Sequence, residues 1–395
     1  MQIVQMLHRQ AIAAAQRYAS IFRVVVITGP RQSGKSTLTR LAFPNKPYFN
    51  LEDSATRARV QADPSAFLRG LPLGAVIDEV QRFPELLSDL QPIVDERQIK
   101  GDFILTGSQQ FGLIDSVSQS LAGRAGMLSL LPLSGAELAA AGKLPSSWHT
   151  AAWRGGYPEP VLQHSDAAAA QAWFASYMAT YVERDVRQVI NLGDLASFRR
   201  FVLMCAARAG QLLNLQSLAS DCGIAHTTAK RWLTVLEASY IVMLLQPHYR
   251  NFNKRLVRTP KLYFLDTGLL CHLLQIDTAK TLELHAMRGA VFENWVITET
   301  LKHRYNQGLS AQLYFWRDNH GTEIDMLFEH HGLLHAVEMK SGSSFASDWP
   351  AATKKWQSYA GAEAAKPTIV YGGKNSFEIE ACNVMGWQDM AGTRS

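Results

Sequence analysis

The sequence predicts an α/β fold whose first part is built on a parallel β-sheet. Short apolar segments alternate with helical patterns through residues 22–135, and this rhythm is typical of βα units. A glycine-rich turn separates the first apolar segment from a helical pattern, and the third apolar segment ends in two carboxylates. The expected strands are Phe22–Thr28, Tyr48–Leu51, Gly74–Ile77, Phe103–Thr106 and Met127–Leu131.

Composition and length indicate an ordinary globular chain with several domains. The 395 residues are 47% hydrophobic and 18% charged, and no apolar run approaches the ~18 residues that a membrane-spanning helix needs. The N-terminus has no secretory signal pattern, and the four cysteines have neither CxxC nor metal-ligand spacing, so we expect them to be reduced and buried. We therefore expect a cytoplasmic protein with domain boundaries near residues 140, 200 and 280.

A phosphate-binding loop is the most specific motif in the sequence. The segment that follows the first strand fits the pattern G-x-x-x-x-G-K-[ST], in which backbone N–H groups surround a phosphate at a helix N-terminus. Lys35 would neutralise the β- and γ-phosphates, and the Ser36 hydroxyl would ligate Mg²⁺. The residues expected to contact ATP are Gly29, Pro30, Arg31, Gln32, Ser33, Gly34, Lys35, Ser36 and Thr37.

The third and fourth strands supply the other residues that this chemistry requires. Asp78 would hold the Mg²⁺ ion through its water shell, and Glu79 would activate the attacking water. Thr106 and Ser108 would sense the γ-phosphate, although a plain turn at the strand end explains them equally well. Arg124 is a candidate arginine finger for a neighbouring subunit, with a surface or intrachain salt bridge as the alternative.

These motifs resemble a prokaryotic AAA-type ATPase family whose members carry a C-terminal domain of unknown function. The resemblance implies ATP binding, hydrolysis and a homo-oligomer, for which a hexamer is one candidate. It extends over nearly the whole chain and is carried by Gly29–Gln32, Asn50–Asp53, Asp78–Gln81, Leu105–Ser108, Leu121–Arg124, Tyr181–Val186 and Lys261–Gly268.

The middle of the chain is strongly basic and predicts a DNA-binding module. Twelve Lys or Arg residues and four Asp or Glu residues lie between Arg184 and Lys261. A helix–turn–helix pattern over residues 215–237 and a following hairpin suggest a winged helix, with a role as a protein-interaction module or spacer as the alternative. The residues expected to contact DNA are His226, Thr227, Lys230 and Arg231 on the second helix, and Lys254 and Arg255 in the wing.

The C-terminal segment contains the D…E-x-K pattern of the PD-(D/E)xK nucleases. Glu338 and Lys340 share one strand face, and a turn at His330–Gly332 would bring Asp325 beside them. Glu293 on the preceding helix completes an expected metal site with Asp325 and Glu338, although Ile324 stands where the family has proline. We expect this fold over residues 281–395, and cleavage and binding without cleavage remain open alternatives.

The combined prediction is a DNA-binding ATPase that remodels or translocates DNA, with ATP and Mg²⁺ as cofactors and no membrane partner. DNA intermediates of recombination or repair are candidate substrates. A nucleotide-controlled interaction or signalling switch and an ATP-regulated nuclease are the alternatives.

Overall fold

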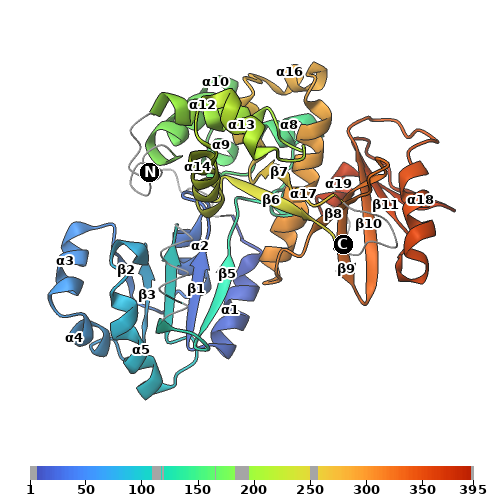
Figure 1. The fold of residues 1–395 in the computed structure, drawn as a ribbon. Coiled ribbons are helices and arrows are strands. Elements are labelled where there is room, and N and C mark those ends of the chain that lie inside the picture. Colours follow the sequence, from blue (N-terminus) through green and yellow to red (C-terminus); the bar gives the residue numbers. More distant parts are fainter. Residues whose placement is uncertain are drawn as a thin grey trace. The chain divides into compact units, whose positions relative to one another are not determined.

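The computed structural model describes residues 7–108, 117, 120–164, 166–182, 195–249 and 257–392 (Figure 1). It separates into two compact units. The first comprises residues 1–133, 238–240 and 302–310, and the second comprises the remainder. The expected boundaries near residues 200 and 280 lie inside the second unit.

The first unit is a five-stranded, fully parallel sheet in the order β2-β3-β4-β1-β5. Its strands are β1 (Val24–Thr28), β2 (Tyr48–Asn50), β3 (Ala75–Asp78), β4 (Phe103–Gly107) and β5 (Ala125–Ser129). Its helices are α1 (Ala11–Ile21), α2 (Lys35–Ala42), α3 (Ser54–Ala62), α4 (Pro64–Arg69) and α5 (Leu86–Arg97), with the short η1 (Val80–Arg82). All five strands expected from the sequence are confirmed to within two residues at each end.

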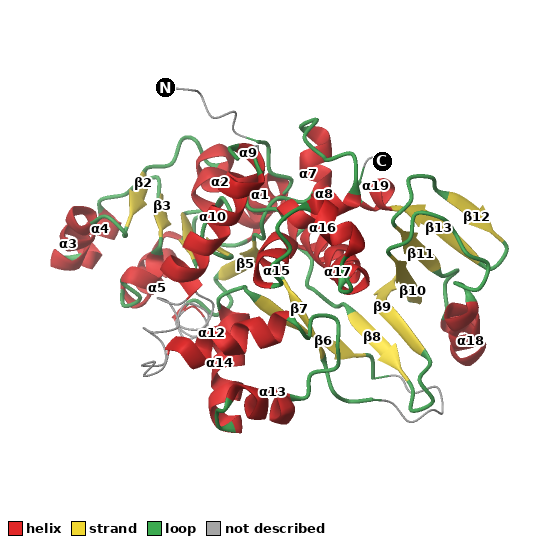
Figure 2. Cartoon of the chain, turned by 90° about the horizontal axis from the view of Figure 1, so that it is seen from above, coloured by secondary structure: helices red, strands yellow, loops and turns green. Residues whose placement is uncertain are grey.

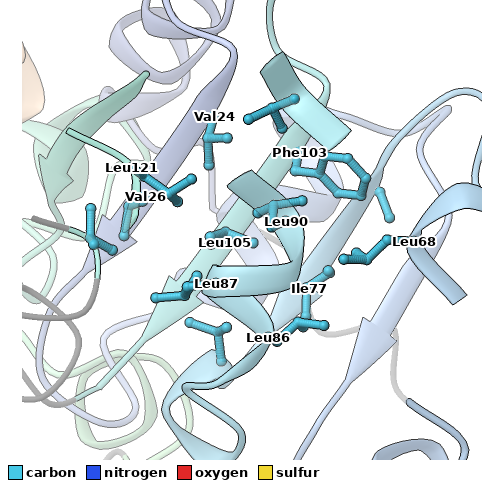
Figure 3. Close-up of a cluster of buried hydrophobic side chains, with 14 of the residues drawn as sticks. Val24, Val26, Leu68, Ile77, Leu86, Leu87, Leu90, Phe103, Leu105 and Leu121 are labelled. Atoms are coloured by element: carbon cyan, nitrogen blue, oxygen red, sulfur yellow. The ribbon is translucent and has the colours of Figure 1, made fainter. Parts of the chain in front are cut away.

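The side chains of β1 point alternately to the two faces of the sheet, and each face has its own buried hydrophobic cluster. Val24 and Val26 join a buried cluster that includes side chains of α5, such as Leu87 and Leu90 (Figure 3). Val25 and Ile27 point into the other cluster, with alanines of α1 and Leu38 of α2. Both faces are therefore covered by helices, which explains why the strand is a continuous apolar run rather than an alternating one.

The second unit begins with a predominantly helical region. Its helices are α7 (Gly135–Ala140), α8 (Trp148–Arg154), α9 (Pro158–Leu162), α10 (Ala167–Tyr177), η2 (Met178–Val182), α12 (Leu195–Ala206), α13 (Leu215–Cys222), α14 (His226–Ala238), α15 (Thr267–Leu273) and α16 (Ala279–Leu284). The turn between α13 and α14 is made at Gly223, whose φ of 68° is the left-handed conformation that glycine adopts without strain.

An eight-stranded mixed sheet forms the rest of this unit, in the order β12-β13-β11-β10-β9-β8-β6-β7 (Figure 2). Its strands are β6 (Val242–Pro247), β7 (Lys261–Phe264), β8 (Tyr314–Arg317), β9 (Glu323–His330), β10 (Leu333–Lys340), β11 (Thr368–Tyr371), β12 (Phe377–Ile379) and β13 (Cys382–Gly386). The accompanying helices are α17 (Arg288–Asn306), α18 (Ala351–Ala360), η3 (Gly361–Glu363) and α19 (Trp387–Met390). Trp356 of α18 packs on Leu327 of β9 and Leu334 of β10.

The hairpin expected to form a wing is part of this larger sheet. β6 and β7 are antiparallel neighbours, as expected, but β6 also pairs in parallel with β8 through Gln246 and Pro247. A strand edge offers unpaired N–H and C=O groups, and the last two residues of β6 pair with β8 along this edge. The hairpin is thus continuous with the sheet that the sequence assigned to a separate domain.

All four cysteines are free and buried. Within the described parts of the chain, no helix has both the length and the apolar character that crossing a membrane requires.

Candidate nucleotide-binding site

The loop between β1 and α2 adopts a conformation that its glycines make possible. Gly29 and Gly34 have φ values of 154° and 95°, and Gln32 is also left-handed at 61°. A Cβ added to Gly29 would lie 2.1 Å from the carbonyl oxygen of Leu130, so a side chain could not fit there. The two glycines are therefore required by backbone geometry and close approach.

Lys35, the first residue of α2, folds back over this loop. Its Nζ donates hydrogen bonds to the carbonyl oxygens of Gly29 at 3.0 Å and Pro30 at 2.8 Å. Burial lowers the pKa of Lys35, while the nearby carboxylates of Glu79 and Asp78 oppose this shift. A phosphate group would stabilise the ammonium form, because it would place negative charge beside a buried lysine.

Three hydroxyl groups from three different elements converge on Asp78, the last residue of β3. Ser36 Oγ donates to Asp78 Oδ2 at 2.6 Å, and the Tyr48 hydroxyl donates to the same oxygen. Thr106 of β4 donates to the other oxygen, Oδ1. This brings together the serine and the aspartate that the sequence predicts to hold Mg²⁺, although β4 lies between β3 and β1, the strand that precedes the loop.

Tyr48 is a member of the site that sequence reasoning missed. Burial, followed by its hydrogen bond to Asp78, raises the pKa of Tyr48 to about 12. It remains a neutral donor at physiological pH and can orient the Asp78 carboxylate. No local pattern in the sequence indicates this role: Tyr48 enters the site because it begins the strand that pairs with β3, in a register that places it opposite Val76.

Glu79 lies just beyond the strand and is held by polar side chains. Its backbone is left-handed, with a φ of 57°, and its N–H donates to Thr106 Oγ1 at 3.2 Å. Ser108 Oγ donates to Glu79 Oε2 at 3.1 Å, and Gln81 Nε2 donates to that oxygen and, at 2.9 Å, to Ser108 Oγ. Thr106 and Ser108 thus contact the two acidic residues, an arrangement compatible with γ-phosphate sensing. Gln81 is a further residue that the sequence did not single out.

The loop fits a nucleotide phosphate, and the residues around Asp78 fit Mg²⁺. Ser33 Oγ is fully buried and has no hydrogen-bond partner among the described residues, and Lys35 is held by backbone carbonyls that an anion could replace. Ser36 and Asp78 supply the hard oxygen donors that Mg²⁺ prefers. When bound, the metal would neutralise developing charge on the phosphates. Of the other residues expected to contact ATP, Arg31 lies within the loop and Thr37 in the first turn of α2.

Arg124 does not contact the nucleotide loop of its own chain. Its Nε and Nη2 donate to the two carboxylate oxygens of Asp95, each at 2.6 Å. Arg124 precedes β5, and its carbonyl oxygen accepts a hydrogen bond from the N–H of Val24, the first residue of β1. The nucleotide loop follows the last residue of β1, so the length of this strand, about 13 Å, separates the Arg124 backbone from the loop. The structure therefore forms the intrachain salt bridge that was the alternative for this residue, and the arginine finger stays a prediction.

The second helix of the helix–turn–helix, α14, presents the basic face that the sequence predicted. His226, Thr227, Lys230 and Arg231 lie on this helix outside its buried stripe. Ala229, Leu233 and Leu236 are buried, as the helical spacing requires. Lys254 and Arg255 lie outside the described residues.

The D…E-x-K residues meet on adjacent antiparallel strands. The β9–β10 turn is made by His331 and Gly332, both with positive φ, so the predicted hairpin is confirmed. Asp325 Oδ2 accepts a hydrogen bond from the backbone N–H of Met339 at 2.8 Å, between Glu338 and Lys340. Lys340 Nζ donates to Glu338 Oε1 at 2.6 Å.

Lysines, rather than an open metal position, neutralise these carboxylates. Lys261 of β7 bridges Glu293 Oε1 at 3.0 Å and Glu323 Oε1 at 2.5 Å, although no pattern in the sequence indicates this role. No group of three or more His, Cys, Asp or Glu side chains among the described residues has an arrangement suited to a metal ion. The expected metal site of Glu293, Asp325 and Glu338 is therefore not formed as predicted. The ammonium groups of Lys261 and Lys340 form ion pairs with Glu293 and Glu338 instead.

Burial and mutual repulsion dominate the electrostatics of this acid–lysine cluster. Burial, then the charges of Glu293 and Glu338, raise the pKa of Asp325 well above its ordinary value. Burial also raises the pKa of Glu338, while Lys340 acts in the opposite direction. Both shifts favour the neutral, protonated carboxyl over the carboxylate, which reduces the repulsion between these buried acids.

The sheet order, the glycine loop and the convergence on Asp78 define a P-loop domain. Residues 22–139 match the family model described as an AAA domain, which identifies the first unit as a P-loop ATPase domain of the AAA type. Residues 145–280 and 288–390 match two models described as domains of unknown function, DUF8612 and DUF4143.

The chain belongs to the same family as the uncharacterized protein Rv2008c of Mycobacterium tuberculosis (strain ATCC 25618 / H37Rv). The two are 35% identical over 377 residues, which cover 94% of this chain and 81% of the relative. The uncharacterized protein Mb2031c of Mycobacterium bovis (strain ATCC BAA-935 / AF2122/97) matches equally, at 35% identity over the same shares of each chain.

Solved structures that match the chain include the Walker-type ATPase PABY2304 of Pyrococcus abyssi. Its TM-score is 0.46 at 14% identity, covering 67% of this chain and 95% of that one. A single-residue variant of RuvB from Thermotoga maritima has a TM-score of 0.30 at 19% identity, covering 59% of this chain and 85% of that one.

Proposed function

We propose that this protein is an ATPase that binds DNA and couples ATP hydrolysis to remodelling or translocation of that DNA. The observation that carries the ATPase part is the convergence of Ser36 and Thr106 on Asp78, beside a loop that holds Lys35. Such a site supplies the phosphate cradle, the metal-binding oxygens and, in Glu79, a base beside the γ-phosphate position.

The face of α14 supports the DNA-binding part of the proposal. Lys230 and Arg231 lie near the start of the second helix of a helix–turn–helix, the end that enters the major groove in many such modules. His226 and Thr227 add hydrogen-bonding groups on the same segment. Phosphate contacts by the two cations would supply affinity that is independent of sequence.

The decisive experiment measures ATP hydrolysis by the full chain with single-stranded, duplex and branched DNA. A rate increased by one of these DNAs, and abolished by Glu79→Gln, is the expected result. Glu79→Gln should retain bound ATP, because Asp78 still holds the metal. A basal rate that no DNA changes, together with no gel shift on any of them, would favour the alternative of a nucleotide-controlled interaction switch.

A homo-oligomer promoted by ATP is part of the same proposal. Its support is the AAA-type domain, since the Asp95 contact of Arg124 provides none. Light scattering at micromolar protein, with and without a non-hydrolysable ATP analogue, tests it. A monomer under both conditions would refute this part without affecting the nucleotide site.

The nuclease alternative has one favourable observation and one against it. Asp325 and the Glu338–Lys340 pair lie on adjacent strands, as a D…E-x-K site requires. Lys261 neutralises Glu293, which would otherwise help to hold the metal. Strand cleavage that needs Mg²⁺ or Mn²⁺ and disappears in both Asp325→Ala and Lys340→Ala would establish this activity.

A further inference from the structure

We propose that Arg9 is a positioning residue of the nucleotide site, which fixes the phosphate-binding loop in its active conformation and places a permanent positive charge beneath it. The inference depends on the nucleotide site proposed above and adds a residue that lies outside the G-x-x-x-x-G-K-[ST] motif. Arg9 precedes α1, and it is almost completely buried, with 3% of the residue exposed.

The guanidinium group of Arg9 joins the loop to the end of the sheet. Nη1 donates to the carbonyl oxygen of Ser33 at 2.6 Å, and Nη2 donates to the carbonyl oxygen of Leu131 at 2.7 Å. Ser33 is the residue before the second loop glycine, and Leu131 follows β5. Both bonds are short and charge-assisted, so each restrains its carbonyl more strongly than a neutral hydrogen bond would.

The bond to Ser33 determines where the next N–H group points. A trans peptide is planar, so its C=O and N–H groups point in opposite directions, and the structure contains no cis peptide among the described residues. With the Ser33 carbonyl directed at Arg9, the N–H of Gly34 is directed away from Arg9. In a phosphate-binding loop, backbone N–H groups of this kind surround the bound anion.

The charge of Arg9 should act on the anion as well as on the loop. A Cβ added to Gly34 would lie 3.1 Å from Arg9 Nη1, so the guanidinium group lies directly against the loop backbone. Arginine stays protonated in proteins, and burial reduces the screening of its charge by water. Arg9 can therefore attract phosphate from behind the loop while Lys35 contacts it directly.

Arg97 provides a matched control in the same unit. Like Arg9, it donates hydrogen bonds to backbone carbonyls, those of Leu71 at 2.9 Å and Leu68 at 3.2 Å. Unlike Arg9, it lies at the opposite end of the sheet from the loop, where it contacts Asp102 just before β4. Arg97→Gln should lower the melting temperature without changing nucleotide affinity.

The test is a titration of the full-length Arg9→Gln, Arg9→Lys, Arg97→Gln and Lys35→Ala variants with a fluorescent ATP analogue, alongside thermal melts. Arg9→Gln should weaken binding by about tenfold or more. Arg9→Lys should weaken it less, because it retains the charge but cannot bridge both carbonyls.

Unchanged affinity in Arg9→Gln and Arg9→Lys, with clearly weakened binding in Lys35→Ala, would overturn the role of Arg9 and leave the nucleotide site intact. If Lys35→Ala binds like the unmodified protein, the nucleotide site itself is wrong. Should Arg9→Gln fail to fold, Arg9→Lys decides: normal affinity in that variant would also refute the proposal, since the lysine cannot hold both carbonyls.

Discussion

The hydroxyl of Ser36 donates a 2.6 Å hydrogen bond to Oδ2 of Asp78, although 42 residues separate them in the chain. Ser36 is the second residue of α2, and Asp78 ends β3, which β4 separates from β1 in the sheet. Parallel strands place their carboxyl ends on one edge, and this edge collects the loop, the serine and the acids. The bond therefore joins the two motifs on which the nucleotide site depends.

Lys35→Ala should weaken nucleotide binding by roughly 10–100-fold, because it removes the ammonium group held over the loop. Titration with a fluorescent ATP analogue measures the effect. Lys46→Ala is the matched control, since Lys46 also donates to two carbonyl oxygens, those of Leu73 and Asp102, away from the loop. Equal losses in the two variants would contradict a specific role for Lys35.

Tyr48→Phe should raise the Mg²⁺ concentration needed for half-maximal hydrolysis by about tenfold, because the Asp78 carboxylate loses a group that orients it. The measurement is the ATPase rate as a function of Mg²⁺ at saturating ATP. Tyr18→Phe removes a comparable hydroxyl, bound to the Gly308 carbonyl, and should leave the Mg²⁺ requirement unchanged. Identical Mg²⁺ curves for all three proteins would make Tyr48 a packing residue.

Arg124→Ala and Asp95→Ala should both lower the melting temperature, Asp95→Ala by more, because Asp95 also accepts a hydrogen bond from Arg23 at 2.7 Å. The double variant should be little worse than Asp95→Ala alone, because that change already breaks the Arg124–Asp95 ion pair. Hydrolysis per molecule should persist below the melting temperature. Selective loss of hydrolysis in Arg124→Ala, with Asp95→Ala fully active, would favour the arginine-finger interpretation instead.

Lys230→Glu and Arg231→Glu should weaken DNA binding similarly on unrelated sequences. Removing one phosphate interaction should flatten the slope of log K against log salt by about 0.9 for duplex DNA. Fluorescence anisotropy over a range of salt concentrations measures both effects. Lys280→Glu, on α16, is a charge-matched control outside the helix–turn–helix. Binding that is equally weakened by all three variants would indicate nonspecific attraction to a basic surface.

Asp325→Asn should stabilise the protein at neutral and alkaline pH. Asparagine imitates the protonated carboxyl and can still accept the hydrogen bond from Met339. Because the pKa of Asp325 is raised on folding, the folded state binds its proton more tightly, and ionisation destabilises it as pH rises. The gain should therefore be largest above the folded pKa and should fade as pH falls toward the ordinary aspartate value.

Chemical denaturation at several pH values measures this difference. A gain that grows toward acid would show that Asp325 is stabilised as the carboxylate instead. Addition of Mg²⁺ to the unmodified protein gives a second comparison: metal-dependent stabilisation that Asp325→Asn abolishes would show that a cation can displace the lysines.

The sequence by itself determined the elements whose signals are local. The loop from Gly29 to Ser36 was predictable because only glycine tolerates the dihedral angles at its two glycine positions and because its spacing is set by the phosphate. The buried face of α14 followed from helical periodicity, and the β9–β10 turn from a glycine between two apolar strands. In each case the physical cause lies within a few residues of the effect.

Only the tertiary structure decided which charges meet across long separations. Nothing near Arg124 in the chain indicates Asp95 as its partner, and nothing near Lys261 indicates Glu293 and Glu323. Tyr48 and Arg9 likewise enter the nucleotide site because β2 pairs with β3 and because the segment before α1 reaches the loop. Side-chain pairing depends on distances of a few ångströms, and these are set by how sheets and helices pack rather than by any local pattern.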